Sequence, residues 1–192
     1  MLRPDPRSSD SNRRDYVGSM GLTIDDLLAK EEIRDVIYRY ARGVDRMDFD
    51  LVASCYHPDA YDDHGTFQGD VPGFIEMCKG FLPRYLVTQH FMGNLLIEVF
   101  GDVARAETYA VAYHRKELGD GSGHDDVFGI RYVDRFEKRD GGPWLIAHRV
   151  VATEWRRVDP VPVGKLRGHV GVWGHRDESD VINWILTATT PV

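Results

Sequence analysis

The sequence predicts an α+β fold in which N-terminal helices pack inside a strongly curved antiparallel sheet. Two observations lead to this prediction. Apolar residues recur with helical spacing up to about residue 81, whereas four long segments after residue 85 have the length and alternation of strands. Helices followed by consecutive strands are typical of the α+β class. A sheet bent around such helices would form a cone-shaped barrel with a pocket between the two layers.

The composition is that of a single globular domain. The chain has 192 residues, of which 42 % are hydrophobic and 29 % charged. Its formal net charge of −7 disfavours nucleic acid or an anionic membrane as the main partner. No apolar run is long enough for a membrane span, and no apolar secretion signal opens the chain, so we expect a cytoplasmic protein. We expect Cys55 and Cys78 to be buried and reduced rather than joined in a disulfide.

Three regions divide the chain. Residues 1–20 mix Pro, Ser, Arg and Asp with few apolar side chains, which predicts a disordered N-terminal tail. Residues 21–158 form the predicted domain. Residues 159–192 begin with a segment rich in Pro and Gly and form a C-terminal extension, in which Glu178–Leu186 is predicted to be a short helix.

The first helix is predicted to begin at Thr23, because Thr23 and Asp26 have the spacing of a capping box. Its apolar residues follow the i, i+3, i+4, i+7 rule as far as Val44, which predicts one buried stripe. Asp45 follows directly, so we expect its carboxylate at the border of that stripe. Tyr40 lies on the stripe itself.

Two shorter helices follow, with a strand or edge segment between them at residues 59–69. The second helix is predicted over Asp50–Tyr56, with Asp48 as a candidate cap. The third is predicted over Val71–Phe81, between a capping residue at Asp70 and a proline stop at position 83.

Four long strands complete the predicted domain. Turn signals at Gly101-Asp102 and Asp140-Gly141 join consecutive strands into hairpins. The predicted strands are Tyr85–Phe100, Val103–Glu117, Val127–Arg139 and Trp144–Val158.

His90 is a candidate catalytic residue in the first long strand. With a period of two, His90 shares a face with Thr88, Met92 and Asn94, while Phe91 takes the other face together with Leu95 and Ile97. A histidine among apolar residues on a strand is also compatible with a hydrogen-bonded core position.

Asp45 is the candidate partner of His90. A buried carboxylate needs a partner, and an aspartate bonded to one imidazole nitrogen leaves the other nitrogen as an acid or base near neutral pH. Solvation at the helix end, or an ion pair with Arg42 or Arg46, is the alternative. Tyr40 could polarise a substrate carbonyl or simply fill the core.

A metal site is not expected. Five residues between 57 and 64 have the composition of metal ligands, but their spacing matches no closed zinc pattern. They are His57, Asp59, Asp62, Asp63 and His64.

The sequence resembles the SnoaL-like branch of the nuclear-transport-factor-2-like, or cystatin-like, superfamily, near scytalone dehydratase, bile-acid 7α-dehydratase and lindane dehydrochlorinase. The resemblance covers roughly residues 22–157. Its three anchors are YARGVDRMDFD at 40–50, TQHFMGN at 88–94 and RYVDRFEKRDGGPWLIAHRV at 131–150. It implies a cone-shaped fold, no metal or organic cofactor, and a homo-oligomer, with a trimer favoured over a dimer.

The resemblance also implies roles for single residues. The family's catalytic aspartate and histidine fall on Asp45 and His90, and a catalytic tyrosine falls on Tyr40. A water-binding tyrosine is replaced by His64. Four residues are predicted to bind substrate: His64, Asn94, Tyr113 and Arg149. Only one of the neighbours Tyr113 and His114 can face the pocket, and Tyr113 is favoured.

The predicted activity is a cofactor-independent lyase, a dehydratase or related elimination, acting on a small hydrophobic cyclic substrate. His90 would remove a proton and Asp45 would orient it. Two alternatives remain open at this point. A polyketide cyclase or ketosteroid-type isomerase would use the same pair of residues, and a non-catalytic module would bind a small molecule without reaction.

Overall fold

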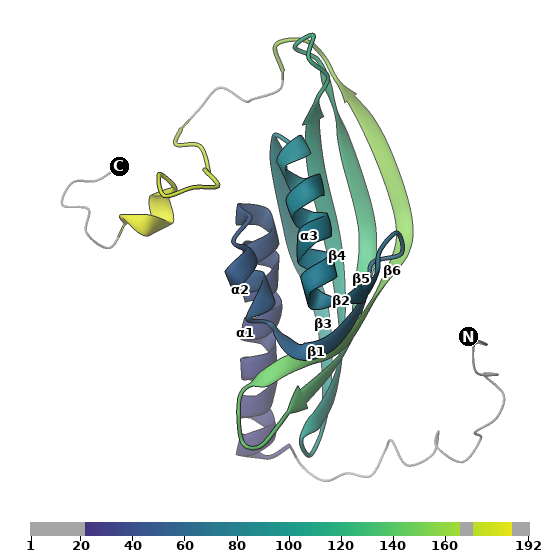
Figure 1. The fold of residues 1–192 in the computed structure, drawn as a ribbon, viewed down its shortest axis with the longest axis vertical. Helices are drawn as coiled ribbons and strands as arrows, with labels where there is room; N and C mark the ends of the chain where they lie inside the picture. The colour runs from purple at the N-terminus through teal and green to yellow at the C-terminus, as the bar shows by residue number, and fades with distance from the viewer. Residues whose placement is uncertain (1–21, 166–170, 186–192) are drawn as a thin grey trace, which may run out of the picture.

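The computed structural model describes residues 22–165 and 171–185, so the predicted N-terminal tail lies outside the described residues (Figure 1). Its helices are α1 (Ile24–Arg46), α2 (Phe49–Ala53) and α3 (Val71–Phe81), with two short 3-10 turns, η2 (Leu82–Arg84) and η3 (Val181–Asn183). The strands are β1 (Tyr56–Asp63), β2 (Gln68–Asp70), β3 (Val87–Phe100), β4 (Val103–Glu117), β5 (Gly123–Lys138) and β6 (Trp144–Val161).

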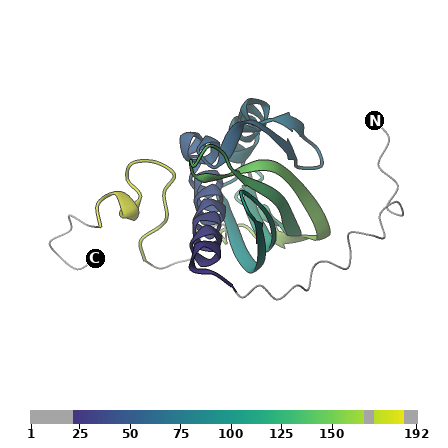
Figure 2. The ribbon, with the colours of Figure 1, turned by 90° about the horizontal axis from the view of Figure 1, so that it is seen from below.

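The strands form one sheet in the order β2-β1-β6-β5-β4-β3. The sheet curls around α1 and α3, which lie on its concave face, and its edges β2 and β3 do not meet (Figures 1 and 2). The α+β class is therefore confirmed, with a curled but unclosed sheet. One pairing differs from the fully antiparallel prediction, because β1 runs parallel to β6.

Helix α1 forms as its sequence predicts. The Thr23 side chain accepts a hydrogen bond from the backbone N–H of Asp26, whose carboxylate accepts one from Thr23 in return, which confirms the capping box. The helix ends at Met47 in the left-handed conformation. Gly43 lies where α2 crosses closely, since a Cβ there would approach the Val52 side chain to 2.8 Å. A larger residue would push the two helices apart.

A β-bulge at Gly93 and Asn94 changes which residues of β3 face the helices. Met92 pairs with Ala110, and the next pair is Leu95 with Thr108. Two residues of β3, Gly93 and Asn94, therefore lie opposite a single residue of β4. The prediction that Leu95 turns away from His90 is therefore wrong. After the bulge, Leu95 and Ile97 point to the same concave face as His90, and Ile97 is buried.

Several boundaries differ from prediction because distant pairing extends the strands. Helix α2 ends early and Tyr56 begins β1, since Cys55 and Tyr56 join the ladder with β6. Strand β5 starts four residues earlier than Val127, and β6 continues to Val161, because the two pair along their whole length. The predicted final helix is reduced, in the described residues, to the turn η3. Helix α3 and strand β4 have the predicted bounds.

The core lies between the helices and the concave face. The buried stripe of α1 belongs to one apolar core with alternate residues of β4, several of which are alanines. Cys55 and Cys78 are buried and free, as predicted. Among the described residues, no helix is long and apolar enough to cross a membrane.

Candidate active site

Asp45 and His90 form a hydrogen-bonded pair between the last turn of α1 and the start of β3. Asp45 Oδ1 lies 2.7 Å from His90 Nδ1, and Asp45 Oδ2 accepts the backbone N–H of His90, also at 2.7 Å. Thr88 adds a hydrogen bond of 3.4 Å from its hydroxyl to the backbone carbonyl of Asp45. Both carboxylate oxygens therefore hold the same residue, which fixes the orientation of the imidazole.

The electrostatics of this pair favour an ionised aspartate. Burial raises the pKa of Asp45, but the hydrogen bonds from His90 and the charge of that residue outweigh burial, so the pKa lies below its usual value. The ionised carboxylate accepts Nδ1–H and directs the imidazole lone pair to Nε2. None of the described residues makes a hydrogen bond to Nε2.

A second histidine, His114 on β4, faces the same space. Its ring lies 5.5 Å from that of His90, at a right angle, and 5.0 Å from that of Tyr85. His114 Nδ1 is buried and has no hydrogen-bond partner among the described residues. Burial, followed by the charge of His90, lowers the pKa of His114 to about 4, so this imidazole is neutral near pH 7.

The preference for Tyr113 over His114 is therefore wrong. Thr88 pairs with His114 and Gln89 with Tyr113, so the strand register places Tyr113 on the convex face, opposite His90. The Tyr113 hydroxyl donates to Asp125 at 2.8 Å. The register of β3 against β4 decides between two adjacent residues, and the alternating pattern of β4 alone does not reveal which face is inward.

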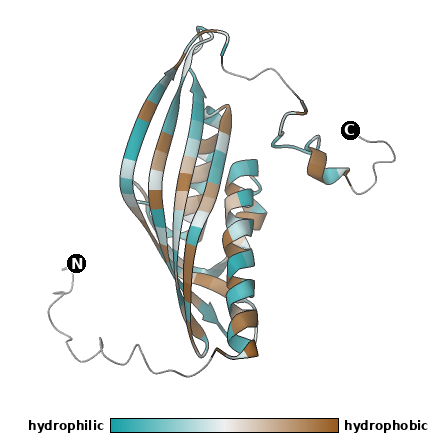
Figure 3. Cartoon of the chain, turned by 180° about the vertical axis from the view of Figure 1, so that it is seen from behind, coloured by the Kyte–Doolittle hydropathy of each residue, from teal (hydrophilic) through white to brown (hydrophobic). Residues whose placement is uncertain are grey.

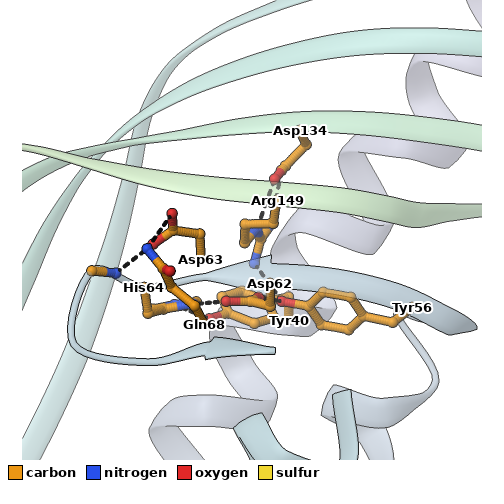
Figure 4. Close-up of polar contacts among 9 residues, drawn as sticks. Tyr40, Tyr56, Asp62, Asp63, His64, Gln68, Asp134 and Arg149 are labelled. Atoms are coloured by element: carbon orange, nitrogen blue, oxygen red, sulfur yellow. Dashed lines mark hydrogen bonds and ion pairs between the residues drawn. The ribbon is translucent and has the colours of Figure 1, made fainter. Parts of the chain in front are cut away.

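A second polar cluster lies on the concave side of the sheet and contains three of the predicted site residues, Tyr40, His64 and Arg149 (Figure 4). The Tyr40 hydroxyl is 3.1 Å from His64 Nε2. His64 Nδ1 is hydrogen-bonded to Asp62 Oδ1, and Asp62 Oδ2 accepts the Tyr56 hydroxyl at 2.7 Å. Nothing in the sequence pointed to Asp62 beyond its place in an acidic segment, but the alternation of β1 turns Asp62 inward and Asp63 outward.

Arg149 is part of this cluster and is completely buried. Its guanidinium donates to both carboxylate oxygens of Asp134, at 2.7 and 2.8 Å, and to the Tyr56 hydroxyl at 3.2 Å. It also lies 4.0 Å from the centre of the Tyr40 ring. The structure thus places Arg149 against the Tyr40 ring, enclosed by the protein.

Asn94 lies on the other side of the sheet from His90. The bulge exposes it at a hollow of about 660 Å³ on the convex face, where Phe91, Tyr109 and Trp155 also contribute. The prediction that Asn94 shares the face of His90 is therefore wrong. The bulge that moves it was not visible in the alternation of the sequence.

The C-terminal segment reaches the Asp45–His90 pair through Arg176. Its guanidinium donates to the carbonyl oxygen of Tyr85 and to the Thr88 hydroxyl, both at 2.9 Å. Residues 171–185 therefore lie beside the end of α1 and the start of β3 (Figure 1). This contact was missed by sequence reasoning, because 88 positions separate Arg176 from Thr88.

The described residues contain no group of three or more His, Cys, Asp or Glu side chains arranged to hold a metal ion. The predicted ligand-like residues between 57 and 64 are spread over both faces of β1. His57 bonds the Glu137 carbonyl and Asp59 pairs with Arg139, while Asp62 and His64 belong to the buried cluster.

Structures of known proteins share this fold. A type 2 hexachlorocyclohexane dehydrochlorinase, LinA, superposes with a TM-score of 0.65 at 22 % identity, covering 77 % of this chain and 98 % of its own. A scytalone dehydratase-like protein from Novosphingobium aromaticivorans gives 0.62 at 18 % identity, covering 76 % and 97 %. A protein of cystatin-like fold from Nostoc punctiforme gives 0.56 at 19 % identity, covering 70 % and 96 %.

Sequence comparison gives the family. An uncharacterised protein of Mycobacterium tuberculosis, Rv2910c, is 27 % identical over 133 residues, which are 67 % of this chain and 88 % of that protein. The model of the SnoaL-like domain matches residues 25–150, well over half of the chain. This match shows that the chain belongs to the SnoaL-like family.

Proposed function

We propose that the protein is a cofactor-independent lyase that removes a proton and a leaving group from a small hydrophobic cyclic substrate. The observation that carries this proposal is the double hydrogen bond between Asp45 and His90. It fixes the tautomer and direction of an imidazole whose Nε2 has no partner among the described residues. A positioned base of this kind contributes about 10²–10⁴ in rate.

His90 is the base and Asp45 its orienting group in this proposal. Asp45 stabilises the imidazolium that forms when Nε2 takes a proton from carbon. His114, neutral and with an unpartnered Nδ1, is placed to hydrogen-bond a substrate oxygen. Such a contact would satisfy a buried polar atom that otherwise costs about 1–3 kcal/mol.

The surroundings of the two histidines favour an apolar ring as substrate. Phe81, Tyr85 and Phe128 place their rings within 6.4 Å of His114. Aromatic walls with few polar groups are typical of sites for small apolar ligands. The names of two structural neighbours, a dehydrochlorinase and a scytalone dehydratase-like protein, also refer to eliminations from cyclic compounds.

We also propose that the protein is a homo-oligomer that associates through the convex face of the sheet. This face carries exposed apolar side chains on β3, β4 and β6, and brown segments recur along the strands in Figure 3. Its exposed apolar side chains include Phe91, Leu96, Tyr109 and Trp155.

The test uses two cyclic probes, nitrobenzisoxazole and β-hydroxytetralone. The first reports removal of a proton from carbon by ring opening, and the second reports loss of water by formation of naphthol. We expect His90→Gln and Asp45→Asn each to slow both reactions by about 10²–10⁴. His148→Gln is the matched control, because His148 is an exposed histidine on β6 that pairs with Arg135, far along β5 from the strand partners of His114.

Loss of water measured by mass identifies a lyase, whereas a product of unchanged mass from β-hydroxytetralone would identify an isomerase. A wild-type protein that transforms neither probe, or a His90→Gln protein that retains wild-type rates, would contradict the proposed function.

A further inference from the structure

Arg176, in the C-terminal segment, carries a positive charge that no carboxylate of the described residues pairs with. Its guanidinium is half-buried and donates to neutral oxygens. These are the carbonyl of Tyr85 and the hydroxyl of Thr88, both at 2.9 Å, and the carbonyl of Leu82 at 3.5 Å. The hydrogen bonds hold the guanidinium in place but leave its charge without an ionic partner.

This environment sets Arg176 apart from the other arginines that the structure describes as buried or half-buried. Each of the others forms an ion pair with at least one carboxylate: they are Arg34, Arg46, Arg115, Arg131 and Arg149. A charged group that loses water without gaining a counter-ion is in an unfavourable position. We therefore looked for the missing partner of Arg176 in a ligand.

The nitrogen that Arg176 leaves without a partner is one that carboxylates use elsewhere in this protein. Arg115, Arg149 and Arg156 each hold both oxygens of a carboxylate through Nε and Nη2. In Arg176, Nη1 and Nη2 make the hydrogen bonds to the carbonyls and the hydroxyl, whereas Nε makes none to the described residues. Nε and the second hydrogen of Nη2 therefore remain for an external carboxylate.

The neighbouring charges do not occupy these donors. Burial lowers the pKa of Arg176 most, the charge of Asp45 raises it, and that of Arg46 lowers it, so both charges lie within electrostatic reach. Both carboxylate oxygens of Asp45, however, bond His90, and Arg46 pairs with Asp180 at 3.9 Å. Arg176 thus keeps its charge and its remaining donors for a ligand.

The position of Arg176 relative to His90 suits a ring that carries a carboxylate. Thr88, which accepts the hydrogen bond from Arg176, is two residues from His90 on the same face of β3, a separation of about 6.6–6.8 Å. Tyr85 gives its carbonyl to Arg176, while its ring lies 5.0 Å from that of His114. A carboxylate on Arg176 would therefore lie at one end of the space that the two histidines face.

We propose that Arg176 binds a carboxylate of the substrate and thereby aligns the ring with His90; this rests on the proposed elimination. The substrate is then a cyclic acid, apolar in its ring and anionic at one end. Arg176 lies outside residues 25–150, which match the SnoaL-like domain, so this selectivity belongs to the C-terminal extension of the chain.

The experiment measures binding to the full-length protein rather than turnover. 2-Naphthoate and 2-naphthamide share one apolar ring system and differ in charge, so the ratio of their dissociation constants isolates the carboxylate contact. We expect calorimetric titration of the wild type to show about tenfold tighter binding of 2-naphthoate. Arg176→Gln should weaken 2-naphthoate alone and bring the two constants within about twofold of each other.

Arg84→Gln is the matched control. Arg84 is exposed at the end of η2, directly before Tyr85, so this variant removes an equal charge from the same part of the molecule. We expect it to keep the wild-type preference for 2-naphthoate. Arg176→Lys retains the charge without the planar fork and should keep a preference of about threefold.

A different result is expected if Arg176 only holds the C-terminal segment in place. Arg176→Gln would then weaken both ligands equally and leave the ratio of their dissociation constants at the wild-type value. That result would overturn the carboxylate site. Equal affinities of the wild type for the two ligands, or no measurable binding of 2-naphthoate, would overturn it as well.

The failure of this site and that of the proposed function give different results. If Arg176→Gln loses the preference for 2-naphthoate while His90→Gln retains the rates with both cyclic probes, the carboxylate site stands and the elimination is wrong. If His90→Gln slows both reactions while the wild type binds the two naphthalene ligands alike, the elimination stands and the carboxylate site is wrong.

Discussion

At the scale of single residues, His114 is the side chain whose burial has the clearest consequence for stability. It is buried, its Nδ1 lacks a partner among the described residues, and burial together with His90 lowers its pKa from 6.5 to about 4. The folded-state pKa therefore lies below that of the unfolded chain. The unfolded chain takes up the proton first as pH falls, so His114 destabilises the fold progressively between about pH 6.5 and pH 4.

His114→Phe should remove this dependence of the folding stability on pH. A shift of this size corresponds to about 3 kcal/mol once both states are protonated. We therefore expect the free energy of unfolding of the wild type to fall by about 3 kcal/mol more than that of His114→Phe between pH 7 and pH 4. Urea unfolding at several pH values measures the difference, and parallel curves for the two proteins would contradict a neutral buried imidazole.

At the scale of secondary-structure elements, the bulge in β3 allows one strand to serve both the site and the core. Before the bulge, alternate residues include Thr88 and His90, which contact Asp45. After it, Leu95 and Ile97 turn to the same face and pack in the core. If Gly93 and Asn94 continued the regular alternation, both apolar side chains would face outward, because a shift of one residue moves the side chains to the other face of the sheet.

Deleting Asn94 should therefore cost less than deleting Leu96, which lies just beyond the bulge. Without Asn94, Met92, Gly93 and Leu95 alternate regularly, so Leu95 and Ile97 still face the core. Deleting Leu96 instead turns either Leu95 or Ile97 outward, a loss of about 1.5–3 kcal/mol from burial. Chemical unfolding of the two variants tests this, and equal stabilities would contradict the role of the bulge.

At the scale of the whole molecule, the two faces of the sheet carry different kinds of side chain. The concave face holds the two His–carboxylate pairs against α1, while the convex face exposes large apolar side chains around a hollow of about 660 Å³. Phe91 is 66 % exposed there, although it directly follows His90 in the chain. Association through this face would bury apolar surface without covering the concave site.

Phe91→Lys should shift the oligomer towards smaller species, because a charge in the centre of an apolar contact is costly to bury. Leu28→Lys is the matched control, since Leu28 is also an exposed apolar residue but lies on α1. Sedimentation velocity measures the assembly. A wild-type monomer, or a Phe91→Lys protein that assembles like the wild type, would contradict association through the convex face.

Local patterns determined much of the fold. The capping box at Thr23, the bounds of α3 and the whole of β4 follow from caps, prolines and alternation within a few residues, and the structure has them as predicted. The predicted contact of Asp45 with His90 also forms. The resemblance to known sequences pointed to that pair directly, whereas periodicity alone placed both residues only near a buried face.

Tertiary structure decided the features that depend on pairing between distant segments. The parallel pairing of β1 with β6 extends β1 into residues predicted to be helical and turns Asp62 towards Tyr56. The register of β3 on β4 selects His114 over Tyr113, and the bulge moves Asn94 to the convex face. The sequence by itself thus determined the elements, because caps and apolar periods act over a few residues. Only the tertiary structure decided which polar groups meet, because that depends on register across the sheet.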